Sequence, residues 1–240
     1  MEILKKIIAF GDSVMKGVVS AVDSQSVVKY KVSDDNFVDT CARRLGVTIE
    51  NRSRFGSTIL NGLDCIERYF SHIESGNLVV MEFGGNDCNF DWKAISADPD
   101  GEHLPKLTLD QFVATYDRVI DRVENAGARP MMLSLPELDS QRFFNHVSAG
   151  LNKENILKWL RGDVNNIAHW HEQYNLEVFK IAARRRVWLI DISSVFLRQR
   201  RLGDYLCDDG MHPNEAGHKL ISDAILSAVS ERWPLISGSV

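Results

Sequence analysis

The chain alternates short apolar runs with longer segments in which apolar residues recur at helical spacing. The short runs predict five strands, at 5–10, 47–51, 78–83, 130–135 and 187–192. The run at 78–83 is almost unbroken, which is typical of a strand buried on both faces. The periodic segments predict helices over 34–46, 57–73, 108–127, about 164–184 and about 214–228.

Strands that alternate with helices indicate βαβ units, which place parallel strands in one sheet with helices on both faces. The sequence therefore predicts an α/β fold with a mostly parallel, five-stranded sheet. Functional residues of such folds gather beyond the carboxyl ends of the strands. The segments that follow the predicted strands are therefore the first place to look for chemistry.

Three segments that follow predicted strands, and one just ahead of the last helix, combine glycine with polar side chains. They are Gly11-Asp12-Ser13, NRSRFGST with Gly56, GGND with Asn86 and Asp87, and DDGMHPNEAG with Asp208, Asp209 and His212. A serine hydroxyl is a poor nucleophile unless a neighbouring imidazole accepts its proton. Because histidine titrates near neutral pH, His212 is the expected base for Ser13.

The remaining parts of an acyl-transfer site are also present. An imidazole base needs an acceptor on its second nitrogen, and Asp209, three residues before the histidine, is expected to supply it. Asp208 is the alternative. Donors to the developing oxyanion are expected from the backbone N–H groups of Ser13 and Gly56 and from the side-chain amide of Asn86.

Each of these residues also has an ordinary structural interpretation. Ser13 could be a helix N-cap, Gly56 a turn glycine, and Asn86 part of an Asx turn. His212 could hydrogen-bond only within its own loop. The catalytic interpretation depends on finding all four in this order after strand ends.

Taken together, these segments resemble the conserved blocks of the SGNH hydrolases, the GDSL-type esterase and lipase superfamily. FGDSV resembles the nucleophile block with Ser13, and NRSRFGST the second block with Gly56. GGND resembles the third block with Asn86, and DGMHP the last block with Asp209 and His212.

The resemblance implies a three-layer αβα sandwich, flavodoxin-like in appearance, with a five-stranded parallel sheet. It also implies an open site that hydrolyses esters, without a metal or another cofactor. Two departures are Val14, where the block name has leucine, and Ser53, where a glycine is often found. The other common plan for serine hydrolases needs a G-x-S-x-G motif, and the sequence has none.

Length and charge limit the other possibilities. A chain of 240 residues with no low-complexity linker is expected to form a single domain, 1–240. The net charge of −5 and scattered basic residues argue against a nucleic-acid partner. The apolar stretch 7–10 is too short for a signal peptide or a membrane span, so we expect a cytoplasmic protein without stable membrane insertion.

The cysteines and one cluster of arginines are each interpreted as structural rather than as sites of chemistry. The cysteines, at 41, 65, 88 and 207, form no CxxC pair and are expected to be reduced, with Cys41 and Cys65 on apolar helix faces. The basic cluster Arg184-Arg185-Arg186, with Arg198, Arg200 and Arg201 further on, favours a solvated helix end over an anion site.

Two long segments at strand ends, 88–107 and 136–163, are expected to be insertions that shape the substrate pocket. Their aromatic residues, Trp92, Phe143, Phe144 and Trp159, are expected either to stack on substrate or to anchor the loops. HWH at 169–171 invites a metal site, but residues two apart on a helix point in different directions, so no metal is expected.

The sequence thus predicts a serine esterase that acts on a small-molecule ester. Short-chain substrates such as acetylated sugars are the preferred expectation. The alternatives are hydrolysis of lysophospholipids or acyl thioesters, and a noncatalytic ligand-binding module on the same fold.

Overall fold

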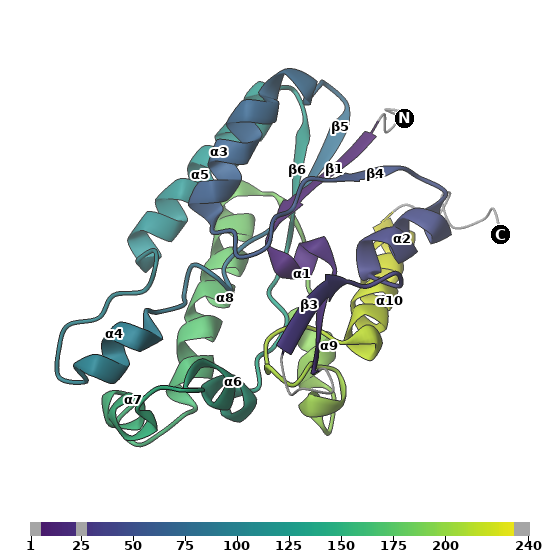
Figure 1. Cartoon of the computed structure of the whole chain (residues 1–240). Helices are drawn as coiled ribbons and strands as arrows, with labels where there is room; N and C mark the ends of the chain where they lie inside the picture. Colours follow the sequence, from purple (N-terminus) through teal and green to yellow (C-terminus); the bar gives the residue numbers. More distant parts are fainter. Residues whose placement is uncertain (1–5, 23–27, 233–240) are drawn as a thin grey trace.

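The structure is a computed structural model that describes residues 6–22 and 28–232. Its centre is a five-stranded sheet in the order β4-β1-β5-β6-β7, in which every neighbouring pair is parallel (Figure 1). The strands are β1 (Lys6–Gly11), β4 (Ile49–Asn51), β5 (Asn77–Glu82), β6 (Arg129–Leu133) and β7 (Trp188–Ile190). The five predicted strands and their parallel pairing are therefore confirmed.

Helices cover both faces of this sheet. One face carries α3 (Ile59–Tyr69), α5 (Leu109–Asn125) and α8 (Asn166–Arg185), and the other carries α2 (Phe37–Leu45), α9 (Ser193–Leu197) and α10 (Glu215–Arg232). Side chains alternate along β1, so that Ile8 and Phe10 join the first helix layer and Ile7 and Ala9 join the second. This arrangement is the αβα sandwich that the sequence predicted.

Four short helices and one 3₁₀ turn lie around the carboxyl end of the sheet. They are α1 (Ser13–Lys16), α4 (Trp92–Ala97), α6 (Ser140–Val147), α7 (Lys153–Trp159) and the turn Leu202–Asp204. A second 3₁₀ turn, Phe70–His72, joins α3 to β5 at the opposite end. Figure 1 shows α4, α6 and α7 grouped beyond one end of the sheet. They come from the segments 88–107 and 136–163, and their apolar residues form a separate cluster around Trp92, Phe143 and Phe144.

Sequence analysis did not predict the antiparallel hairpin formed by β2 (Val18–Val22) and β3 (Val28–Val32). Its second strand, VKYKV, alternates apolar and charged residues, which is typical of a strand with one solvent-exposed face. Helix boundaries also differ slightly from those expected. For example, α2 starts at Phe37 rather than at 34, because the Asn36 side chain caps it by accepting from the Asp39 N–H.

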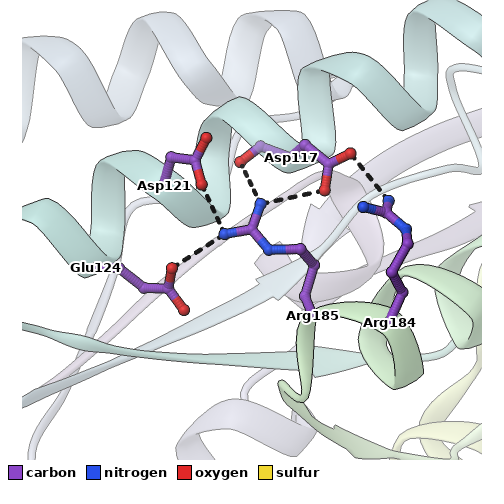
Figure 2. Close-up of polar contacts among 5 residues, drawn as sticks. All are labelled: Asp117, Asp121, Glu124, Arg184 and Arg185. Carbon is purple, nitrogen blue, oxygen red and sulfur yellow. Dashed lines mark hydrogen bonds and ion pairs between the residues drawn. The ribbon is translucent and has the colours of Figure 1, made fainter.

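All four cysteines are free and buried, as expected. The basic cluster was expected to be solvated, but Arg184 and Arg185 instead bind acidic side chains of α5 (Figure 2). Arg185 contacts Asp117, Asp121 and Glu124 at 3.1, 2.6 and 3.0 Å. Its side chain is 18% exposed, so these ion pairs link α8 to α5 at a partly buried position.

Asp87 follows β5 by five residues and is fully buried. Its Oδ1 accepts from the N–H of Ile59 at 2.9 Å, at the first turn of α3. Its Oδ2 is buried and has no hydrogen-bond partner within residues 6–22 and 28–232. Burial raises the pKa of Asp87 to about 7, because the charged form loses its hydration there.

We expect Arg185→Gln to lower the free energy of unfolding by about 1 kcal/mol, because it removes a partly buried ion-pair network. Arg184→Gln is the matched control, since Arg184 is more exposed and binds Asp117 alone among the acidic residues of α5. Urea denaturation at low and at high salt measures the loss of unfolding free energy in each variant. High salt should reduce the difference between the losses of the two variants. Equal losses for the two variants would contradict the role given to Arg185.

We expect Asp87→Asn to change the pH dependence of stability. The folded pKa of about 7 lies above the ordinary value of 3.8, so wild-type stability falls as pH rises between these values. The asparagine keeps an acceptor for Ile59 but does not titrate. Urea denaturation from pH 4 to 8 should therefore show the variant gaining stability relative to wild type up to about pH 7. A constant difference across this range would contradict the prediction.

Candidate active site

Ser13 is held at the junction between β1 and α1. The chain turns tightly here, and a Cβ on Gly11 would lie 2.5 Å from the Cβ of Met15 and 2.8 Å from the Glu82 carbonyl oxygen. Asp12 then caps α1 by accepting from the N–H of Val14 at 2.8 Å. Ser13 is therefore the first helical residue rather than the N-cap, and its hydroxyl is not used by the helix start.

His212 and Asp209 share a tight loop ahead of α10. The Cys207 N–H donates to the His212 carbonyl at 2.8 Å, which closes the loop. Asp209 Oδ1 accepts from the backbone N–H groups of Met211 and His212, each at 3.0 Å. Its Oδ2 lies 2.7 Å from His212 Nδ1. The exposed Asp208 has no such position, so the geometry favours Asp209 over this alternative.

The structure brings the two ends of the chain together in a triad-like arrangement. His212 Nε2 lies 2.9 Å from Ser13 Oγ, although 199 positions separate the two residues. All three side chains are buried. Burial alone would raise the pKa of Asp209, but hydrogen bonds from the His212 ring and from two backbone N–H groups outweigh it and lower the pKa to about 2. Asp209 is therefore ionised at neutral pH and can stabilise a charged His212.

The three expected oxyanion donors line the same pocket as the triad-like residues. The Ser13 N–H lies at the start of α1, and Gly56 adopts a φ of +69° with open space where a Cβ would be. The Asn86 side chain donates to Asp12 Oδ2 at 2.8 Å. Its Nδ2 carries two hydrogens, so this bond fixes the amide and leaves a second hydrogen for a ligand.

Asp12 is a site residue that sequence analysis missed. It caps α1 with one oxygen and orients Asn86 with the other. Glu82, at the end of β5, is buried close enough to this carboxylate to affect its pKa. Burial raises the pKa of both carboxyl groups, but hydrogen bonds from Val14 and Asn86 offset part of this rise at Asp12. Repulsion from Asp12 raises the pKa of Glu82 further, well above its ordinary value, so we assign the proton of the pair to Glu82 and the charge to Asp12. For Glu82, the one sequence signal was that an acidic residue stands inside the apolar run LVVMEF.

Two aromatic residues cover the outer side of His212. The ring of Phe55 stacks on the imidazole at a centroid distance of 6.0 Å, and Tyr30 meets it edge-on at 5.3 Å. Burial, with a smaller effect of Asp209, raises the pKa of Tyr30 to about 12. Tyr30 comes from the unpredicted hairpin, so nothing in the sequence analysis could have placed it here.

A pocket of about 120 Å³ opens beside Ser13 and His212. Residues of both predicted insertions line it, including Phe90, Trp92 and Phe143. Trp92 and Phe143 also pack in the apolar cluster of α4, α6 and α7, and Phe144 and Trp159 belong to that cluster without lining the pocket. Trp92 and Phe143 therefore anchor the loops, as one of the two expectations had it, and they also line the pocket.

The two histidines of HWH point to different surroundings. His169 is exposed, whereas His171 is buried and lines the pocket. Across the described ranges, His, Cys, Asp and Glu side chains form no group of three or more that could hold a metal ion. Within the same ranges, every helix is too short or too polar to cross a membrane.

Comparisons with solved structures show the same fold at low sequence identity. A lipase/acylhydrolase from Enterococcus faecalis is 18% identical with a TM-score of 0.64, over 95% of this chain and 96% of that one. A member of the lipolytic G-D-S-L family from Veillonella parvula is 17% identical with a TM-score of 0.65, over 94% and 98%. An acetylxylan esterase from Geobacillus stearothermophilus is 16% identical with a TM-score of 0.62, over 93% of each chain.

A search of curated proteins found no significant match. Residues 9–220, however, match the GDSL-like Lipase/Acylhydrolase family. That span includes every residue of the triad-like arrangement and all three expected oxyanion donors. On this evidence the chain belongs to the GDSL-like lipase/acylhydrolase family, which is also called the SGNH hydrolases.

Proposed function

We propose that the protein is a serine esterase that hydrolyses short-chain carboxylic esters through an acyl-enzyme, with acetylated sugars as the preferred substrate class. The observation that carries this proposal is the hydrogen-bonded series from Ser13 Oγ through His212 to Asp209, at 2.9 and 2.7 Å, at the mouth of a small pocket.

In the proposed reaction, Ser13 Oγ attacks the ester carbonyl carbon while His212 Nε2 accepts the hydroxyl proton. The ionised Asp209 keeps Nδ1 protonated and stabilises the resulting imidazolium. The N–H groups of Ser13, Gly56 and Asn86 bind the negative oxygen of the tetrahedral intermediate. His212 then gives its proton to the leaving alkoxide, and the alcohol departs.

Deacylation repeats these steps with water as the nucleophile. His212 accepts a proton from water, hydroxide adds to the acyl carbon, and the Ser13 oxygen leaves with the proton from His212. The products are a carboxylic acid and an alcohol, and the side chains return to their starting states. No step requires a cofactor.

The lining of the pocket supports a small polar ester. Its walls combine aromatic faces, such as those of Phe90 and Trp92, with polar groups, such as those of Asn86 and Glu137. The structural likeness to an acetylxylan esterase supports the same substrate class. Lysophospholipids and acyl thioesters remain the enzymatic alternative, and the complete set of Ser13, Asp209 and His212 argues against a noncatalytic binding module.

We expect the protein to hydrolyse p-nitrophenyl acetate faster than the butyrate, and the butyrate faster than the octanoate, when kcat/KM is compared. Ser13→Ala should reduce turnover of the acetate by at least about 10³-fold, because the acyl-enzyme cannot form. Wild type and Ser13→Ala releasing p-nitrophenol at the same rate would refute the esterase proposal. A preference for octanoate would refute the short-chain substrate class and leave the esterase standing.

We expect Asp209→Asn to lower kcat for p-nitrophenyl acetate by about 10³- to 10⁴-fold, because the His212 cation loses its charged partner and the ring its correct tautomer. Asp208→Asn is the matched control, since Asp208 is adjacent and exposed, and it should stay within about twofold of wild type. Thermal melting confirms that both variants fold. Similar losses for both, or a larger loss for Asp208→Asn, would contradict the role of Asp209.

A further inference from the structure

His171 is a buried polar residue that the proposed reaction does not use. It lies on α8, lines the pocket that contains Ser13, and is 8% exposed. Among the described residues, no hydrogen bond or ion pair holds its imidazole, and burial lowers its pKa to about 4. A neutral imidazole has one donor and one acceptor nitrogen. The ring nitrogens of His171 are not fully buried, and because the residue lines the pocket, a ligand bound there can supply their hydrogen-bond partners.

Glu137 is a second polar residue in the wall of this pocket, and it is fixed in place. Its Oε1 accepts from the Ser193 hydroxyl at 2.7 Å. Asn175 donates to Ser193 at 3.2 Å and accepts from the N–H of Leu135 at 2.9 Å. The carboxylate is thus tied to the ends of β6 and β7 and to α8, while Ser193 occupies only one of its two oxygens.

Aromatic faces complete this part of the pocket. Phe90 and Trp170 are half-buried, line the pocket, and lie 5.0 Å apart between ring centroids. A sugar ring has apolar C–H faces that pack on aromatic rings and a rim of hydroxyls that need both donors and acceptors. Glu137 accepts, and His171 both donates and accepts.

We propose that His171 and Glu137 form the subsite for the alcohol side of the ester, where they hydrogen-bond the hydroxyl groups of a neutral sugar ring while Ser13 attacks its acyl group. This inference rests on the proposed esterase function and assigns residues to the selection of its substrate. Glu137 and His171 are specificity-determining residues here, and neither takes part in bond making or breaking.

Two other kinds of ligand fit these walls less well. A long acyl chain would cover the His171 ring and the second oxygen of Glu137 without offering either a hydrogen bond, which is costly. An anionic group would be repelled by Glu137, whose surroundings already include Glu172 and Asp191. A quaternary ammonium would suit the aromatic rings and Glu137, but it has no hydrogen bond to offer His171.

The test compares two acetyl esters that differ in the alcohol. Monoacetylated methyl β-xylopyranoside presents free hydroxyls, whereas p-nitrophenyl acetate presents none. We expect the ratio of kcat/KM for the glycoside to that for p-nitrophenyl acetate to fall at least about 10-fold in Glu137→Gln and in His171→Leu, because each variant loses a hydrogen bond to the sugar. The deacetylated glycoside should also inhibit these variants more weakly than it inhibits wild type.

Matched controls are available on the same helix. His169→Leu removes an exposed histidine two positions from His171. Glu172→Gln removes a negative charge near Glu137 from a residue that does not line the pocket, and glutamine keeps an oxygen that can accept from Asn175. Both should keep the substrate ratio within about twofold of wild type. Thermal melting identifies any variant that fails to fold. If His171→Leu does not fold, His171→Asn replaces it. Asparagine keeps one donor and one acceptor, so the substrate ratio of this variant should lie between that of wild type and the roughly 10-fold lower value expected for His171→Leu.

The outcomes separate the subsite from the chemistry. An unchanged ratio in folded Glu137 and His171 variants, with hydrolysis still dependent on Ser13, overturns the subsite and leaves the esterase intact. Faster hydrolysis of acetylcholine than of the acetylated glycoside overturns it as well. Binding of methyl β-xylopyranoside, followed by ligand-observed NMR, tests the subsite even if no ester is hydrolysed. Binding that is equal in wild type and in both variants contradicts the proposal.

Discussion

The site depends on one buried carboxylate, that of Asp12, at the point where β1 and β5 end side by side. The parallel register sets Gly11 opposite Glu82, so both strands deliver their last residues to the same place. Asp12 then caps the helix that presents Ser13 and orients Asn86 beyond the neighbouring strand. One anion in a low-dielectric setting therefore positions both the nucleophile and a proposed oxyanion donor. The raised pKa of Glu82 makes this possible, because a neutral Glu82 adds no second charge beside Asp12.

The carboxyl groups around the site divide into two electrostatic classes. Asp209 is held ionised by the donors of its own loop, and its pKa falls to about 2. Burial instead raises the pKa of Glu82 and Asp87. The difference arises from the number of donors available to each group, since all three are buried. Negative charge is thereby kept next to His212, where a cation develops in the proposed reaction. On the side of Asn86, Asp12 carries the charge and the raised pKa of Glu82 prevents a second one beside it.

The strand-end rule predicted the residues whose roles follow from local sequence. Ser13, Gly56 and Asn86 follow strands, and Asp209 and His212 share one turn, so short motifs were enough to find them. Residues whose roles follow from packing were not predictable in this way. Tyr30 reaches His212 through a half-exposed hairpin, and His171 differs from His169 only in which side of α8 meets the pocket. The sheet was predictable because buried parallel strands are nearly continuous apolar runs, a pattern that VKYKV lacks.

The aromatic walls of the pocket limit how its specificity can change. Trp92 and Phe143 are packed in the cluster that holds α4, α6 and α7 together, so truncating either one opens a cavity in that cluster as well as in the site. Stability and pocket shape are thus coupled through the same rings. The polar members of the wall are less constrained, because His171 has no protein partner within the described ranges and Glu137 uses only one oxygen to hold its position. Substitutions at these two positions can therefore change the preferred alcohol with a smaller loss of folding stability than substitutions of the aromatic residues. Substrate selection is thus expected to depend on these two positions.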